Sequence, residues 1–293
     1  MAKIIAVLIE LLKAVVFGIV EGVTEWLPVS STGHIILLDE FLKLNISPGF
    51  YDMFEIMIQL GAILAVIVLF FHKLNPFAPK KTVQQKKDTW SLWFKVVIAV
   101  LPSAVIGLLV DDPLDSFLRS TPILSTNLNT VVVAAALILY GIAFLFVERN
   151  SEKTFRIREV GQIDYKTALL IGAFQCLSII PGTSRSGATI LGAILLGVAR
   201  PAGAEFSFFL AIPTMLGASA LKLLDYLSEG VEATGTEIGV LIVGCVVSFV
   251  VSLLVIKGLM EYVRKHSFRV FGIYRIILGI LVLAFFGIKA LAM

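Results

Sequence analysis

The chain contains six stretches of about 20 mostly apolar residues, the length that an α-helix needs to cross the hydrocarbon core of a bilayer. Hydrophobic residues make up 58% of the 293 residues and charged residues only 15%. Soluble domains carry roughly 25% charged residues, so a soluble fold is excluded. The sequence predicts an all-α polytopic membrane protein with spans at 53–71, 92–110, 131–147, 206–224, 238–256 and 270–290.

The connections between these spans differ in charge. Three of them, at 72–95, 148–166 and 257–269, carry six, five and four basic residues. The connection at 225–237 has four acidic residues and no basic one, and the one at 111–130 is also mainly acidic. Because basic connections stay on the cytoplasmic side, we expect the first three inside and the other two outside.

Residues 1–52 and 167–205 are apolar but are interrupted in the middle by Pro, Gly, Ser and Thr. The charge pattern requires the second segment to begin and end on the cytoplasmic side, and the first to end outside. A helix interrupted in this way leaves backbone groups unpaired, which is tolerated at membrane depth only where protein or a water-filled cavity covers them. We therefore interpret both segments as re-entrant helical hairpins.

The two interrupted segments also resemble each other. GIVEGVTEWLPVSSTG (18–33) aligns with GAFQCLSIIPGTSRSG (172–187) at an offset of 154 residues, which is 172 minus 18. Residues 1–150 and 151–293 then form two repeats, each with one re-entrant hairpin and three spans. Because three is odd, the repeats have opposite orientations, an inverted-topology arrangement typical of transporters whose broken helices meet at the midplane.

Ionisable residues cluster at the two hairpin tips. The first tip contains Glu21, Glu25 and His34, and the second contains Arg185. Ionisable residues at membrane depth are costly and by default mark a functional site. The second tip, PGTSRSGAT (181–189), opens a helix whose first N–H groups suit an anion, and the planar fork of an arginine matches phosphate oxygens. Together the tips predict a phosphate site.

EGVTE followed by PVSSTGH in the first half, and PGTSRSGAT in the second, resemble the signature regions of the undecaprenyl-diphosphate phosphatase family, also called the bacitracin-resistance proteins. IQLGAILAV (58–66) and FFLAIPTMLGA (208–218) resemble that family too, so the likeness extends over nearly the whole chain. It implies hydrolysis of undecaprenyl diphosphate, a polyprenyl diphosphate lipid, to the monophosphate carrier lipid and inorganic phosphate, which supplies cell-wall synthesis and confers bacitracin resistance.

The same resemblance implies a need for a divalent cation and a site that opens to the outer face of the bacterial plasma (inner) membrane. The bilayer and the lipid substrate are then the expected partners. We expect no nucleic acid and infer no obligate protein partner.

Phosphoryl transfer is helped mainly by positioning and charge neutralisation. We expect Arg185 to hold the terminal phosphate and Ser31 to attack it, forming a transient phosphoserine. His34 is the expected proton-transfer group, because an unperturbed pKa of about 6.5 suits that role; alternatively His34 attacks and Ser31 only binds. Glu21 and Glu25 could share Mg²⁺ or Ca²⁺, or one of them could orient His34. Further substrate contacts are expected from Ser30, Thr32, Gly182, Thr183, Ser184, Ser186, Gly187 and Thr189.

Other interpretations follow from the same residues. A transporter or flippase uses this architecture, but transport alone does not require a Ser–His–Arg set. The phosphatidic-acid phosphatase type fails because no histidine follows Arg185 until His266. Glu55 and Glu205 stand at matching places in the repeats, either as site residues or in structural pairs, and Arg200 is expected to anchor the membrane interface.

Overall fold

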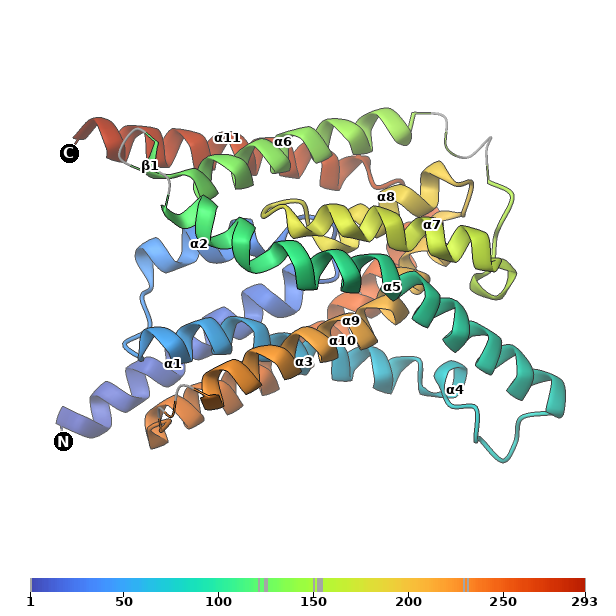
Figure 1. Ribbon diagram of the computed structural model, residues 1–293, viewed down its shortest axis with the longest axis horizontal. Helices are drawn as coiled ribbons and strands as arrows, with labels where there is room; N and C mark the ends of the chain where they lie inside the picture. The colour runs from blue at the N-terminus through green and yellow to red at the C-terminus, as the bar shows by residue number, and fades with distance from the viewer. Residues whose placement is uncertain are drawn as a thin grey trace.

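The protein is a bundle of long helices, most of which run along one axis of the computed structural model (Figure 1). The structure describes residues 2–120, 122, 123, 126–149, 151, 155–228, 230 and 232–292; Asn150, where the first predicted repeat ends, and Lys153 lie outside them. In chain order the elements are α1 (Ala2–Thr24), α2 (Ser31–Phe41), α3 (Pro48–Leu69), α4 (Phe71–Leu74), α5 (Val83–Ser120), β1 (Pro122–Ile123), β2 (Thr126–Asn127), α6 (Leu128–Val147), η2 (Val160–Gln162), α7 (Tyr165–Gln175), η3 (Cys176–Ile179), α8 (Arg185–Leu195), α9 (Arg200–Ser228), α10 (Gly235–Lys265) and α11 (Arg269–Ala292).

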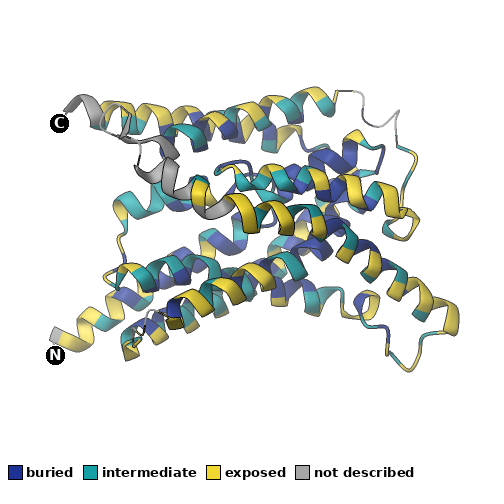
Figure 2. Cartoon of the chain, viewed as in Figure 1, coloured by how far each residue is buried: buried dark blue, intermediate teal, exposed yellow. Residues whose placement is uncertain are grey.

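Within the described ranges, six helices are long and apolar enough to cross a membrane, and each overlaps one predicted span. They are Pro48–Leu69, Val83–Val110, Thr130–Val147, Arg200–Ser228, Gly235–Lys265 and Arg269–Lys289. They are longer than most of the predicted spans because polar ends continue them; α10, for example, begins at a capping box formed by Thr234 and Glu237. Exposed Ile, Leu, Val and Phe cover their outer sides, as lipid contact requires (Figure 2). The prediction of an all-α polytopic membrane protein is confirmed.

Each interrupted segment folds into a helical hairpin. α1 runs inward from the end of the bundle where the N-terminus lies, and α2 returns toward that end (Figure 1). α7 and α8 form a second hairpin that enters from the opposite end, so the tips at 25–30 and 180–184 both lie inside the bundle. The proline in each tip cannot continue the preceding helix, which forces the chain to turn.

The hairpins are held by close helix contacts at glycine. α1 packs along α10 and α7 packs along α5. A Cβ at Gly18 of α1 would collide with the Gly244 carbonyl of α10, and one at Gly172 of α7 would collide with the Ala99 carbonyl of α5. Small residues are what let helix backbones approach this closely in a membrane. Gly18 and Gly172 are also partners in the sequence repeat.

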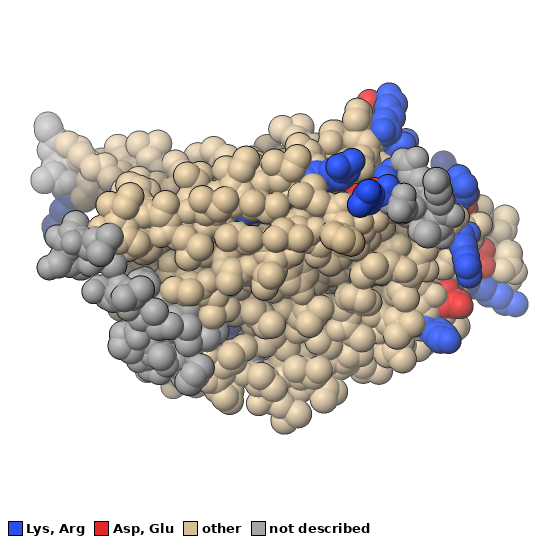
Figure 3. Space-filling model, turned by 90° about the horizontal axis from the view of Figure 1, so that it is seen from above, with Lys and Arg blue, Asp and Glu red and all other residues tan. Residues whose placement is uncertain are grey.

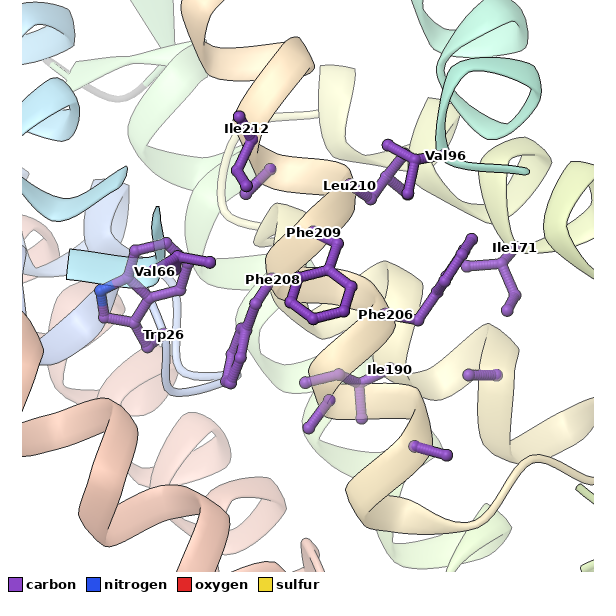
Figure 4. Packing of buried hydrophobic residues seen from close by; sticks show 14 of the residues in the cluster. Trp26, Val66, Val96, Ile171, Ile190, Phe206, Phe208, Phe209, Leu210 and Ile212 are labelled. Carbon is purple, nitrogen blue, oxygen red and sulfur yellow. The ribbon is translucent and has the colours of Figure 1, made fainter. Parts of the chain in front are cut away.

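A cluster of buried aromatic rings fixes the first tip to the second half of the chain. Trp26 is fully buried and meets Phe208 of α9 edge to face, with 5.3 Å between ring centres (Figure 4). Aromatic pairs in this geometry stabilise by about 0.5–1.5 kcal/mol beyond the area they bury. Because Trp26 follows Glu25 directly, this contact places the Glu25 carboxylate beside α9.

Lysine and arginine side chains gather at one end of the molecule, where α3 leads to α5 and α6 leads to α7 (Figure 3). Lys73 there pairs with the buried Glu205 at 2.6 Å, so Glu205 belongs to a structural pair. Arg200 is not the interface anchor that we expected. It is buried and donates to both Glu148 carboxylate oxygens at 2.7–3.0 Å, because the end of α6 and the start of α9 meet inside the protein.

Candidate active site

The two hairpin tips have the same backbone geometry. Ser30 and Ser184, which precede α2 and α8, have φ angles of 73° and 71°, a region that residues other than glycine rarely adopt. Each serine hydroxyl then accepts a hydrogen bond from the N–H three residues on, Gly33 at 3.4 Å and Gly187 at 3.1 Å. These N-caps offset part of the strain. As a result, Ser31 and Arg185 are the first residues of α2 and α8.

An ion pair joins the tips. One guanidinium nitrogen of Arg185 lies 3.0 Å from Oε1 of Glu25, and another donates to the Ser207 carbonyl of α9 at 2.9 Å. Both side chains are about nine-tenths buried. The hydroxyl of Ser31 donates to the second oxygen of the same carboxylate, Oε2 of Glu25, at 3.2 Å. Glu25 therefore stands between the predicted nucleophile and the predicted phosphate-binding cation.

The tips open into a cavity of about 460 Å³ between α3 and α9. Six of the predicted site residues line it: Glu25, Ser31, Thr32, Gly182, Ser184 and Arg185. The remaining polar lining comes from Asp52, Glu55 and Gln59 of α3, from Thr214 and Lys222 of α9, and from Ser178. The cavity thus combines a hydroxyl, a carboxylate and a guanidinium at its base with charged groups on its walls.

Five of the predicted substrate contacts are buried behind the tips and do not line this cavity: Ser30, Thr183, Ser186, Gly187 and Thr189. Ser186 donates to the backbone carbonyl of Glu25 at 3.0 Å, and Thr189 shares a 2.6 Å hydrogen bond with Ser207. Their hydroxyls hold the second tip against the first tip and against α9. The sequence spacing could not separate the four in the second tip from the cavity-lining Ser184, because all lie within two helical turns of it.

His34 lies on a different side of α2. Its Nδ1 is 2.7 Å from the Ser30 carbonyl oxygen, which can only accept, so Nδ1 carries the hydrogen. In the neutral ring Nε2 then accepts from the Tyr274 hydroxyl at 2.7 Å, and the two rings stack 5.6 Å apart. His34 is not among the residues that line the cavity. Its predicted role in proton transfer or attack stays a prediction.

Glu21 is buried behind Glu25, and its Oε1 has no hydrogen-bond partner in the described part of the chain. It interacts electrostatically with both Glu25 and Glu55. However, both oxygens of Glu25 are already engaged, by Arg185 and by Ser31. Among the described residues no three His, Cys, Asp or Glu side chains are grouped to hold a metal ion. The cation that Glu21 and Glu25 were expected to share stays a prediction.

Sequence reasoning missed part of the site. Asp52 and Gln59 were missed, although with Glu55 they fall at positions i, i+3 and i+7 of α3 and share one helix face, and this polar stripe was a usable signal. Glu55, which the sequence left as either a site residue or part of a structural pair, lines the cavity. Arg275 was a second such signal, because it is an arginine within the predicted span 270–290. The structure buries it fully. Lys222 lies close to the predicted span end, where lysines are common, and nothing in the sequence distinguished it.

In the part of the chain that the structure describes, six helices long and apolar enough to cross a membrane surround two helical tips joined through a carboxylate, a hydroxyl and a guanidinium, and this arrangement defines a multi-pass membrane protein. The chain belongs to the family described as bacitracin resistance protein BacA, which matches residues 14–281.

Several relatives are similar to it over nearly their whole length. The chain is 57% identical over 279 residues to Undecaprenyl-diphosphatase 1 of Clostridioides difficile strain 630, covering 95% of this chain and 97% of the relative. It is 57% identical over 278 residues to the undecaprenyl-diphosphatase of Enterococcus faecalis, with 94% and 96% covered. For that of Streptococcus thermophilus strain ATCC BAA-250 / LMG 18311 the identity is 54% over 283 residues, with 96% and 95% covered.

Proposed function

We propose that this protein hydrolyses undecaprenyl diphosphate to undecaprenyl phosphate and inorganic phosphate, and thereby confers bacitracin resistance. The observation that carries the proposal is the Ser31–Glu25–Arg185 arrangement at the base of the cavity. It places a nucleophile and a cation each within hydrogen-bond distance of one base, Glu25. The family and the names of relatives more than 50% identical agree with this activity.

The geometry supports a two-step displacement. Glu25 accepts the hydroxyl proton of Ser31 as Oγ attacks the terminal phosphorus, and the bond from that phosphorus to the bridging oxygen breaks. Undecaprenyl phosphate leaves. Water then attacks the phosphorus of the phosphoserine, the bond from phosphorus to Oγ breaks, and Glu25 returns its proton to Oγ. The water supplies the new oxygen of the inorganic phosphate, and its second proton passes to solvent or stays on the phosphate. Arg185 and the N–H groups at the start of α8 neutralise the charge of the transferred phosphoryl group.

Glu25 takes the position next to Ser31 that we had expected for a histidine. The structure favours it as the first proton acceptor because its Oε2 is 3.2 Å from the Ser31 hydroxyl, whereas His34 faces Tyr274. Arg185 lies 3.0 Å from Glu25 and supplies the counter-charge of this buried carboxylate. Hydrogen bonding by His34 to Ser30 then serves to hold the turn that presents Ser31.

The inverted repeat, with halves 1–150 and 151–293, is part of the proposal. It is supported by the matched serine caps Ser30 and Ser184 and by the matched glycines Gly18 and Gly172. The hairpins enter from opposite ends (Figure 1). In such an arrangement the equivalent first residues of α2 and α8 face each other, one as Ser31 and the other as Arg185.

We also propose that the cavity opens to the outer face of the bacterial inner membrane. Its wall residues lie in the first half of α3 and the second half of α9, toward the end opposite the basic connections (Figures 1 and 3). The basic end is expected in the cytoplasm. A lipid diphosphate would then approach from the outer leaflet.

If a divalent cation is required, we propose that Mg²⁺ or Ca²⁺ enters bound to the diphosphate oxygens. Hard cations prefer oxygen ligands, and the diphosphate supplies several, whereas Glu25 is engaged by Arg185 and Ser31. A chelator would then lower activity in proportion to loss of the cation–diphosphate complex. Glu21→Gln would leave the cation concentration at half-maximal rate unchanged.

The direct test is phosphate release by the purified protein in detergent, with C55 diphosphate compared with shorter prenyl and non-prenyl diphosphates, with and without a chelator. We expect release from prenyl diphosphates and none from Ser31→Ala protein. Hydrolysis needs no sealed compartment, whereas transport does. Absence of any phosphate release in detergent, with intact protein and added cation, would contradict the proposed function and favour transport.

A further inference from the structure

Arg275 lies in the first half of α11, where it is the one charged residue between Arg269 and Lys289, and none of its surface is exposed. A buried charge at membrane depth is costly and is retained only where something compensates it. The described part of the chain places no carboxylate within ion-pair distance of Arg275. The Tyr140 ring, 5.4 Å from its guanidinium carbon, covers one face.

The hydrogen bonds of Arg275 go to the two hairpin tips. Nη1 donates to the carbonyl oxygen of Pro28 at 3.2 Å, in the first tip. Nη2 donates to the carbonyl oxygens of Gly182 and Thr183, each at 2.8 Å, in the second tip. One planar side chain on a third helix therefore bridges two turns that are far apart in the sequence.

These bonds also determine where the tip carbonyls point. Gly182 has φ 87° and lines the cavity, but Arg275 does not line it. The carbonyl oxygens of residues 182 and 183 are thus turned toward α11. Because carbonyl oxygens repel an anion, holding them away leaves the N–H groups at the start of α8 to meet a phosphate.

We propose that Arg275 is a positioning residue that joins the two tips, so that Ser31 of one faces Arg185 of the other. This rests on the proposed function. Glu25 links Ser31 to Arg185: its carboxylate is 3.2 Å from the Ser31 hydroxyl and 3.0 Å from the Arg185 guanidinium. A small shift of one tip would break one of these two hydrogen bonds. A misplacement of about 1 Å in an active site can cost about 100-fold in rate.

The experiment compares Arg275→Ala, Arg275→Lys and wild type in C55 diphosphate hydrolysis, with kcat and KM measured separately. We expect Arg275→Ala to lose about 100-fold in kcat with KM nearly unchanged, since the substrate does not touch Arg275. Millimolar guanidinium should restore part of that kcat by binding in the space left by the side chain and donating to the same tip carbonyls. Arg275→Lys should remain impaired, because a point charge cannot reach carbonyls in both tips as the fork does.

Arg264→Ala, an exposed residue at the end of α10, is the matched control and should keep wild-type kcat with and without guanidinium. A purely structural role would lower the melting temperature without rescue by guanidinium. Near-normal kcat in Arg275→Ala, or a loss confined to KM, overturns the inference. If the alanine variant does not fold, wild-type kcat in Arg275→Lys overturns it. An inactive wild type would instead contradict the proposed function.

Discussion

Glu25 and Arg185 form a buried ion pair of 3.0 Å although 160 residues separate them in the sequence. Each belongs to a helical tip that enters the bundle from its own end, so the pair marks where the two halves of the chain meet. The second oxygen of Glu25 accepts from Ser31. One carboxylate therefore organises both reacting groups, and its removal should have a larger effect than the removal of any wall residue.

Glu25→Gln is expected to lower kcat by about 10²–10⁴-fold, the usual contribution of a general base, with a smaller change in KM. The amide cannot take the Ser31 proton and leaves Arg185 without its counter-charge. Steady-state phosphate release measures this. Glu205→Gln is the matched control, because Glu205 pairs with Lys73 away from the cavity. Equal losses in the two variants would rule out a special role for Glu25.

Ser31→Ala should abolish phosphate release and leave lipid binding largely intact, because only the attacking oxygen is lost. The phosphorylated intermediate of the wild-type protein should be stable in acid and labile in base, as expected for phosphoserine. A species that is labile in acid and stable in base would instead assign the attack to His34. Near-normal turnover by the alanine variant would reject Ser31 as the nucleophile.

Arg185→Lys should remain badly impaired. A lysine cannot bond Glu25 and the Ser207 carbonyl together and still present donors to phosphate, as the guanidinium fork does. Measured kcat/KM should stay well below that of wild type even at low ionic strength. Recovery of activity by lysine would mean that Arg185 contributes only bulk positive charge.

His34→Ala should be strongly impaired, because the turn at Ser30 loses the hydrogen bond to its carbonyl. His34→Asn should recover a substantial part of kcat, since the asparagine amide can donate from nearly the position of Nδ1. The kcat values of the alanine and asparagine variants, measured side by side, separate a role in holding the turn from a role in proton transfer or attack. Equal inactivity of both variants would support proton transfer or attack by the imidazole itself.

The buried Glu148–Arg200 pair should be structural. Glu148→Ala is expected to destabilise the protein by about 3–5 kcal/mol, because it leaves a buried guanidinium without its partner. Thermal unfolding in detergent measures the loss. The double variant Glu148→Leu with Arg200→Met should recover much of the stability. A double variant no more stable than Glu148→Ala would contradict this explanation.

The sequence by itself determined the six spans, the two interrupted segments and the residues at their tips. Apolar length and loop charge act over about 20 neighbouring residues, so they can be read without knowing the fold. Proline, glycine and serine act locally in the same way, which is why the caps at Ser30 and Ser184 agree with the predicted tips.

Only the tertiary structure decided which side chain reaches which. The sequence predicted His34 beside Ser31 and left Glu25 to bind a cation or orient His34. The packing of α2, which no sequence pattern reports, turns His34 toward Tyr274 and brings Ser31 to Glu25. Arg275 joins the tips from a third helix, and Lys222 reaches the cavity from a fourth. Such contacts depend on how separate helices pack, and packing is set by shape complementarity across the whole bundle rather than by spacing along any one segment.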